Sequence, residues 1–182
     1  MSRKVLSKAD APKNISNKEN ELNENDFIVS KTDTSGKIIY CNEIFTKMSG
    51  YPASSLIGAN HNLIRHPDMP RIAFKIAWDL IKDSKEFFGF VKNLSADGSS
   101  YWVFAYMTAD LDSNGKIISY TSVRRKASQS ALNHIIPIYK QLVDAEKRGA
   151  LEASKKLLDE ILQKNKKNYN QFILDLQKGA SL

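Results

Sequence analysis

The chain has 182 residues, of which 42% are apolar, enough for one domain of ordinary size with extensions. Its single cysteine, Cys41, excludes a disulfide framework and a structural zinc site built on cysteines, and it fits a reducing compartment. The formal net charge of +7 is spread along the chain without a basic block interleaved with aromatic residues, so we expect no nucleic-acid partner.

The N-terminal residues 1–25 offer little to bury. Residues 1–18 are mainly Lys, Ser, Asn and Ala and predict a flexible or loosely held tail, and residues 19–25 predict a short helix that leads into the domain. The start of the chain lacks the apolar core of a signal peptide, and no apolar run reaches the length of a membrane span. We therefore expect a cytoplasmic protein without direct membrane insertion.

Residues 26–128 predict one α+β domain around a five-stranded antiparallel sheet. Short apolar runs bounded by turn residues predict strands at residues 27–33, 37–41, 87–94, 100–109 and 116–126. Helical patterns predict short helices at residues 43–49, 54–58 and 71–83. Asn42 is placed to cap the first helix and Gly50 to end it. Asp97-Gly98 and Asn114-Gly115 are strong hairpin signals, so we expect the last three strands to be joined by hairpins.

The connector from Asn60 to Pro70 holds the densest set of chemically active side chains. Its charged and hydrogen-bonding residues include His61, Arg65, His66 and Asp68. Pro67 and Pro70 fix φ and remove backbone donors, which predicts a rigid, irregular segment that is neither helix nor strand. These residues alone leave two interpretations open, a ligand site or a solvated loop whose histidines cap a helix.

The C-terminal residues 129–182 predict helices with a long apolar stripe. The stripe includes Leu132, Ile136, Tyr139, Val143, Leu158, Leu162, Tyr169 and Ile173. Gly149 divides it into two halves, since glycine is unfavourable inside a helix. We expect the stripe to be too large for so small a domain to cover, so that it packs against its own other half, a second copy of the chain or another protein.

The order of these elements resembles the PAS sensor fold. The matching positions are Asn42, Ser49-Gly50-Tyr51, Asp97-Gly98 and Tyr101-Trp102. The segment from His61 to Pro70 is more specific, because together with Phe74, Trp78 and Val91-Lys92-Asn93 it resembles the aerotaxis-receptor subfamily of PAS domains. Members of that subfamily bind FAD and report redox state to the chemotaxis machinery. The resemblance covers about residues 26–128 and implies short helices on one side of the sheet.

The resemblance implies an FAD site in this domain and no metal site. The candidate cofactor-binding residues are Asn42, His61, Arg65, His66, Asp68, Phe74, Trp78, Phe87, Asn93 and Trp102. By resemblance, the Asn93 amide hydrogen-bonds the flavin ring, and Phe87 stands where the family commonly has Trp, so the indole N–H donor is lost. The chemistry of Arg65 suits a phosphate or a polar ring edge. For four of these residues a purely structural role is the alternative to ligand binding. Asn42 could only cap a helix, His66 could only brace the loop, and Trp78 and Trp102 could only pack in the core.

The resemblance implies a non-enzymatic redox or energy sensor, similar to the stand-alone PAS subunit of two-protein energy-taxis receptors. We expect a homodimer that passes the redox state of FAD to a membrane-bound chemotaxis transducer or another helical partner. The alternative is a cofactor-free PAS module for interaction or dimerisation, and a haem held by His61 or His66 is a further possibility. No arrangement typical of an enzyme is visible, and the cysteine context of flavin-adduct light sensors is missing.

Overall fold

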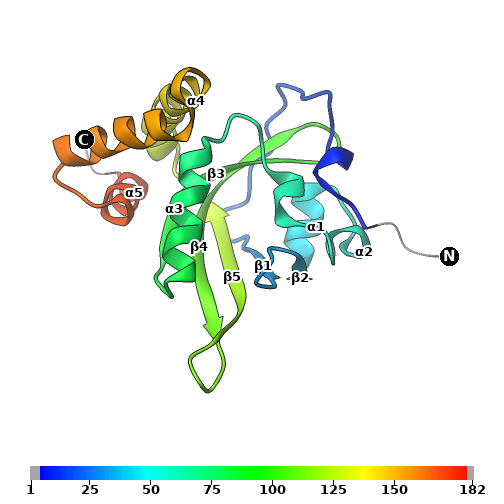
Figure 1. The fold of residues 1–182 in the computed structure, drawn as a ribbon. Coiled ribbons are helices and arrows are strands. Elements are labelled where there is room, and N and C mark those ends of the chain that lie inside the picture. The colour runs from blue at the N-terminus through cyan, green and yellow to red at the C-terminus, as the bar shows by residue number, and fades with distance from the viewer. Residues whose placement is uncertain (1–4, 180–182) are drawn as a thin grey trace.

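A five-stranded antiparallel sheet forms the centre of the computed structural model, which describes residues 5–179 (Figure 1). The strands are β1 (Ile28–Thr32), β2 (Ile38–Cys41), β3 (Phe87–Leu94), β4 (Ser100–Leu111) and β5 (Ile117–Lys126). Their order in the sheet is β2-β1-β5-β4-β3, so β5 pairs with both β1 and β4. The predicted α+β class with five antiparallel strands is therefore confirmed.

Four short helical segments cover one face of the sheet, which we call the inner face. They are α1 (Glu43–Ser49), α2 (Ala53–Leu56), the 3-10 helix η2 (His61–Ile64) and α3 (Arg71–Lys82). Asn42 caps α1, as predicted, by accepting a hydrogen bond from the backbone N–H of Phe45 at 3.2 Å. Gly50 ends α1 with a φ of 70°, a left-handed conformation that glycine adopts without steric cost.

The connector before α3 differs from the prediction of a wholly irregular segment. His61–Ile64 make one turn of 3-10 helix, and the Asn60 side chain caps this turn by accepting a hydrogen bond from Asn62 N at 3.0 Å. Pro67 and Pro70 follow the turn and so do not interrupt it. The connector is therefore more regular at its start than its two prolines indicate.

The N-terminal segment is also more ordered than predicted. The backbone N–H of Ser16 donates to Gly98 O at 2.9 Å and that of Asn20 to Ser100 O at 2.8 Å, so residues 16–20 pair with the turn before β4 and with its first residue. Leu22 lies in the core with only 2% of its surface exposed. Residues 19–25 form no helix; Glu19 and Asn20 pair with Ser100 at the start of β4 instead. A 3-10 turn, η1 (Lys8–Asp10), occurs earlier in the segment, and residues 1–4 lie outside the described part.

The C-terminal helices lie on the opposite, outer face of the sheet, away from α1 and α2 (Figure 1). They are α4 (Gln129–Lys164) and α5 (Tyr169–Gln177). The Tyr139 hydroxyl donates to Phe90 O at 3.0 Å, and the Tyr139 and Trp102 ring centroids are 6.2 Å apart. The residues of α4 and α5 buried in the same core are Ala131, Leu132, Ile135, Tyr139, Leu142, Leu158, Tyr169, Phe172, Ile173 and Leu176. Of the three coverings expected for the stripe, the structure shows its own other half, which packs together with the outer face of the sheet. Ile136 of the stripe remains 41% exposed.

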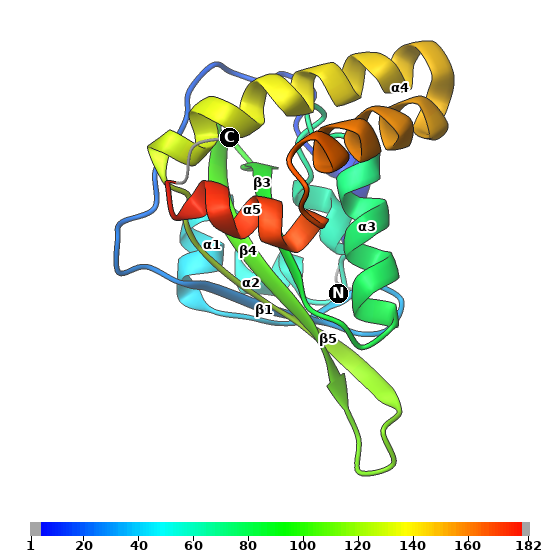
Figure 2. The same ribbon diagram turned by 90° about the vertical axis from the view of Figure 1, so that its left-hand side faces the viewer.

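The helix α4 turns back on itself at Gly149 and Ala150, as Figure 2 shows. A Cβ atom at Gly149 would lie 2.8 Å from the Cβ of Ala153, so no larger residue fits there. The positive φ falls on the next residue, Ala150, at 54°. The predicted division at Gly149 is therefore correct in position, although the strained residue is its neighbour. No helix within residues 5–179 combines the length and apolarity needed to cross a membrane.

Candidate functional site

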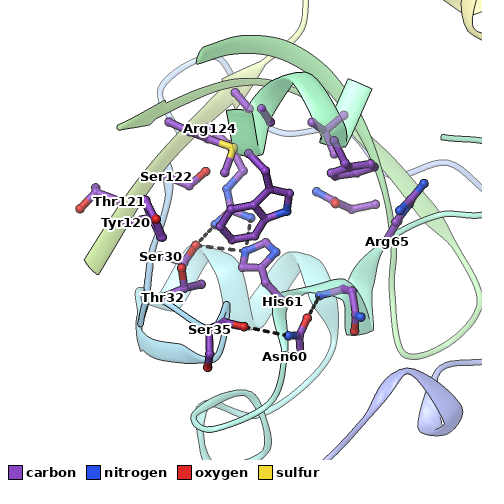
Figure 3. Close-up of a pocket in the computed structure, with 18 of the residues that line it drawn as sticks. Ser30, Thr32, Ser35, Asn60, His61, Arg65, Tyr120, Thr121, Ser122 and Arg124 are labelled. Carbon is purple, nitrogen blue, oxygen red and sulfur yellow. Dashed lines mark hydrogen bonds between the residues drawn. The ribbon is translucent and has the colours of Figure 1, made fainter. Parts of the chain in front are cut away.

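A cavity of about 450 Å³ lies between the inner face of the sheet, the connector and α3 (Figure 3). Its volume falls in the range of roughly 300–1,000 Å³ that is common for small-molecule sites. The strands contribute mainly polar side chains, namely Ser30, Thr32, Asn93, Thr121, Ser122 and Arg124. The helix α3 contributes Phe74, Ala77 and Trp78, with Lys82 at its exposed end. One wall is thus apolar and aromatic, and the opposite floor is polar.

Five of the predicted site residues line this cavity. They are His61, Arg65, Phe74, Trp78 and Asn93. The guanidinium carbon of Arg65 lies 4.2 Å from the Phe74 ring centroid, and its Nη2 donates to Met69 O at 3.2 Å. Trp78 meets the Tyr120 ring edge-on, with centroids 5.4 Å apart. These contacts hold two aromatic rings and one cation at the mouth and wall of the cavity.

Three predicted residues of the first half of the domain lie elsewhere. Asn42 joins β1 to α1, because its Oδ1 accepts from Val29 N at 3.0 Å in addition to capping the helix. His66 is buried, and its Nδ1 accepts from Asp68 N at 3.1 Å. Burial and the nearby Lys92 lower the pKa of His66 to about 4. Burial alone would raise the pKa of Asp68, but its 3.0 Å contact with Lys92 Nζ lowers it overall. His66 and Asp68 therefore brace the connector rather than line the cavity.

Phe87 and Trp102 also lie outside the cavity lining. The Phe87 ring sits over Gly89, where a Cβ atom would meet it at 2.5 Å, and it stacks on Tyr169 of α5 with centroids 5.7 Å apart. Trp102 faces the outer side of the sheet against Tyr139. Both aromatic residues therefore connect the sheet to the C-terminal helices.

Arg124 of β5 is a buried, charged residue of the site that the sequence analysis missed. It is 2% exposed, its Nη2 donates to Ser30 Oγ at 2.6 Å, and its Nη1 lies 3.3 Å from His61 Nε2 (Figure 3). Its guanidinium carbon is 4.6 Å from the Phe45 ring centroid. Because arginine can only donate, Nε2 of His61 is the acceptor and its proton lies on Nδ1. The signal in the sequence was a charged residue inside a strand, but the strand register that turns it inward was not predictable.

The electrostatic character of the cavity follows from these contacts. Burial and the Arg124 charge lower the pKa of His61 to about 3, so this histidine is neutral at physiological pH. Burial lowers the pKa of Arg124 to about 10, which still leaves it charged. Among the described residues that line the cavity, three are cationic and none is acidic. The site is therefore positively charged.

Asn93 places a side-chain amide in the polar part of the cavity. It is 3% exposed and pairs with Tyr101 across the β3–β4 ladder. Within the described residues, neither its Nδ2 nor the Tyr101 hydroxyl makes a hydrogen bond of good geometry. A buried amide with an unused donor is costly unless a ligand or water completes it. The described residues also gather no group of three metal-ligating side chains.

Comparison with known proteins gives this fold a family. The family model described as "PAS fold" matches residues 38–124. The chain is 36% identical over 121 residues to the aerotaxis receptor of Escherichia coli (strain K12), which spans 66% of this chain and 24% of the receptor. It is 30% identical over 104 residues to Phototropin-2 of Oryza sativa subsp. japonica, spanning 57% of this chain and 12% of that protein. A solved light-oxygen-voltage domain, studied with a flavin analogue, aligns with a TM-score of 0.53 at 23% identity, over 61% of this chain and 83% of that domain.

The chain therefore contains a PAS sensor domain. Its type is that of the aerotaxis receptor, which confirms the resemblance carried by the connector residues. The match spans about a quarter of the length of that receptor, as its 24% coverage states, so it concerns the domain and not the whole receptor.

Proposed function

We propose that this chain is a flavin-binding sensor, with FAD as its cofactor, that reports redox or energy state to a signalling partner. The observation that carries the proposal is the cavity of about 450 Å³, which combines aromatic walls with the buried, incompletely bonded amide of Asn93. A flat apolar ring with polar edges fits such a lining. The relatives support a flavin rather than another ring, because one is an aerotaxis receptor and one solved neighbour was studied with a flavin analogue.

The residues of the cavity suit recognition of such a ring. Phe74 and Trp78 provide apolar walls, and the Asn93 amide can offer either its oxygen or its N–H groups to a polar edge. A flavin supplies reversible two-electron chemistry, and one of its ring nitrogens changes from acceptor to donor on reduction. Rotation of the Asn93 amide would match either state. Because Asn93 bridges to Arg65 of the connector through the backbone, a change at the amide can reach the chain before α3.

The positions of His61 and Cys41 favour a non-covalently bound flavin over two alternatives, a haem and a covalent flavin adduct. His61 directs Nε2 toward Arg124 and Ser30, so this nitrogen is already engaged and is poorly placed to ligate a haem iron. Cys41 lies on β2 and does not line the cavity, so a covalent flavin adduct with its sulfur is not part of the proposal. The proposed role is binding and signalling, without catalysis of a substrate reaction.

The signal would leave through the C-terminal helices. The side chain of Glu146 on α4 accepts two backbone hydrogen bonds from the start of α3, the helix that walls the cavity. The protein would need two conformations that differ in the packing of α3 on α4. A ligand shifts the equilibrium between them only by the difference in its affinity for the two conformations. We infer that a helical partner, such as a membrane-bound chemotaxis transducer, reads the position of α4 and α5.

The test is to purify the full chain and record its visible spectrum, then identify any released cofactor by chromatography. We expect an oxidised-flavin spectrum and FAD. The chain offers a matched pair of tryptophans: Trp78→Leu should lower the flavin-to-protein ratio, whereas Trp102→Leu, on the outer face, should leave the ratio in the folded fraction unchanged.

Three results would decide against the proposal. A colourless protein that stays free of flavin after incubation with excess FAD would favour a cofactor-free interaction module. A haem spectrum would identify a different ligand. Equal loss of flavin in both tryptophan variants would show that occupancy follows general stability and not the cavity.

A further inference from the structure

Arg124 is a buried cation whose described neighbours are all neutral. Its Nη atoms contact Ser30 Oγ at 2.6 Å and His61 Nε2 at 3.3 Å, and its guanidinium lies over the Phe45 ring. No Asp or Glu belongs to the described lining of the cavity. A guanidinium carries five N–H donors and stays charged in proteins. The Nε–H of Arg124 is buried and has no hydrogen-bond partner among residues 5–179.

An uncompensated buried charge opposes folding, because it loses its hydration and gains no ion pair. Its retention inside a cavity indicates that the missing negative charge belongs to the ligand. The cavity has room for that ligand directly beside Arg124, since Arg124, Ser30 and His61 all line it (Figure 3). The charge balance of the site is thus incomplete without the molecule that it binds.

The three cations of the cavity differ in burial, and this difference determines which part of a ligand each one can contact. Lys82 is exposed at the end of α3, and Arg65 is half-buried in the connector. Arg124 is 2% exposed and lies on β5 in the interior of the domain. Strongly hydrated phosphate groups are better met by the cations nearest solvent. The buried guanidinium is therefore placed for the part of the ligand that enters the domain, which for a flavin is the ring.

We propose that Arg124 stabilises the negative charge that the flavin ring gains on reduction, and so raises the reduction potential of the bound cofactor; this inference rests on the proposed function above. Two electrons from a reductant such as dithionite, with one proton from solvent, convert the neutral oxidised ring to a reduced ring with one negative charge. That charge is then balanced by the guanidinium. The oxidised ring has no such charge, so Arg124 favours the reduced state.

The experiment is a spectroelectrochemical titration of the full chain loaded with FAD, comparing wild type with Arg124→Met, Arg124→Lys and Arg125→Met. Loss of one charge-assisted hydrogen bond should weaken binding of the reduced relative to the oxidised flavin about tenfold. For a two-electron couple this is a midpoint about 30 mV lower. Arg124→Lys keeps the charge and should recover part of the shift. Arg125→Met removes the neighbouring, exposed cation of β5, which lies over Phe104 outside the cavity, and should leave the midpoint unchanged.

A second measurement separates this role from a structural one. Thermal melting of the flavin-free proteins should show Arg124→Met melting no lower than wild type, because the substitution removes a buried charge without a counter-charge. If the Met variant does not fold, Arg124→Lys still provides the comparison of midpoints. A midpoint shift together with an unchanged or higher melting temperature supports the inference.

The outcomes distinguish this inference from the proposed function. A chain that takes up no flavin overturns the proposed function and this assignment with it. A chain that binds flavin with the same midpoint in wild type and Arg124→Met overturns only the role of Arg124. A variant that binds oxidised and reduced FAD equally more weakly, with no midpoint shift, would place the cofactor phosphates and not the ring beside Arg124, and would also overturn it.

Discussion

His61 is neutral because the fold places it against the Phe45 ring and beside the Arg124 guanidinium. His61 stacks on Phe45 with centroids 5.6 Å apart and accepts from Arg124, and both burial and that cation oppose its protonation. The fold therefore holds a histidine that an unfolded chain would protonate below pH 6.5. His66, whose pKa is lowered to about 4, behaves in the same way in the connector.

We predict an acid-sensitive stability that depends on His61. Between pH 6.5 and about 3 the unfolded chain binds a proton that the folded chain does not, so stability falls as the pH falls through this window. The slope should be on the order of 1.4 kcal/mol per pH unit for each such histidine. His61→Gln keeps an acceptor for Arg124 and should flatten the dependence, as measured by urea unfolding at a series of pH values within this window.

The control for this pH dependence is His134→Gln, which removes the exposed histidine of α4 and should keep the wild-type slope. A His61→Gln chain whose slope equals that of wild type would contradict the prediction. It would mean that the acid sensitivity arises at other groups.

The helix α3 is capped by a residue from another element. Its N-cap position is Pro70, which offers no side-chain acceptor. The carboxylate of Glu146 on α4 takes that role, accepting from Arg71 N at 3.0 Å and from Ile72 N at 2.9 Å. A negative charge at a helix N-terminus is also favourable to the helix dipole. Glu146 further accepts from Ser154 Oγ at 3.1 Å, so one side chain joins α3 to both sides of the α4 bend.

We predict that Glu146→Ala lowers the free energy of unfolding by about 2 kcal/mol, because it leaves two backbone N–H groups at the start of α3 without an acceptor. Glu146→Gln keeps one acceptor oxygen and should lose about half as much. Chemical denaturation checks both variants, and hydrogen exchange should locate the loss of protection in α3. Glu152→Ala, an exposed glutamate of the same helix, serves as control and should change stability by less than about 0.5 kcal/mol.

In the whole molecule the sheet lies between α1 and α2 on one side and the C-terminal helices on the other (Figure 1). The cavity lies on the inner side, the side of α1 and α2. The outer face presents Phe90, Trp102 and Phe104, each less than a tenth exposed while α4 and α5 are in place. Most of the apolar stripe of the C-terminal helices is buried against these rings and between the two halves, whereas Ile136 is 41% exposed. The large uncovered stripe on which the expected homodimer rested is thus mostly covered within one chain, and the homodimer stays a prediction.

We predict that a chain ending at Ser128 self-associates or precipitates, whereas the full chain shows no association through this stripe. Without α4 and α5, the rings of Phe90, Trp102 and Phe104 form an exposed apolar patch, which soluble monomers rarely tolerate. Light scattering across a range of concentrations measures both chains. A truncated chain that stays monomeric and melts like the full chain would show that the helices contribute little to the stability of the domain.

The sequence by itself determined the elements and the family. The strand bounds at Phe87–Leu94 and the α1 bounds at Glu43–Ser49 agree with the prediction, because local turn residues and the cap at Asn42 fix them. The connector from His61 to Pro70 identified the type of domain from its residues alone. These features depend on neighbours in the chain, which a sequence displays directly.

The tertiary structure decided which side chains share the cavity and what covers the stripe. Arg124 reaches His61 across 63 residues of chain, because β5 pairs with β1 and turns both Arg124 and Ser30 inward. Phe87 was expected on a ligand, but it stacks on Tyr169 of α5. A shift of one residue in strand register moves every side chain to the other face, and distant helices compete for the same rings. Both depend on contacts between segments far apart in the sequence, which local patterns do not contain.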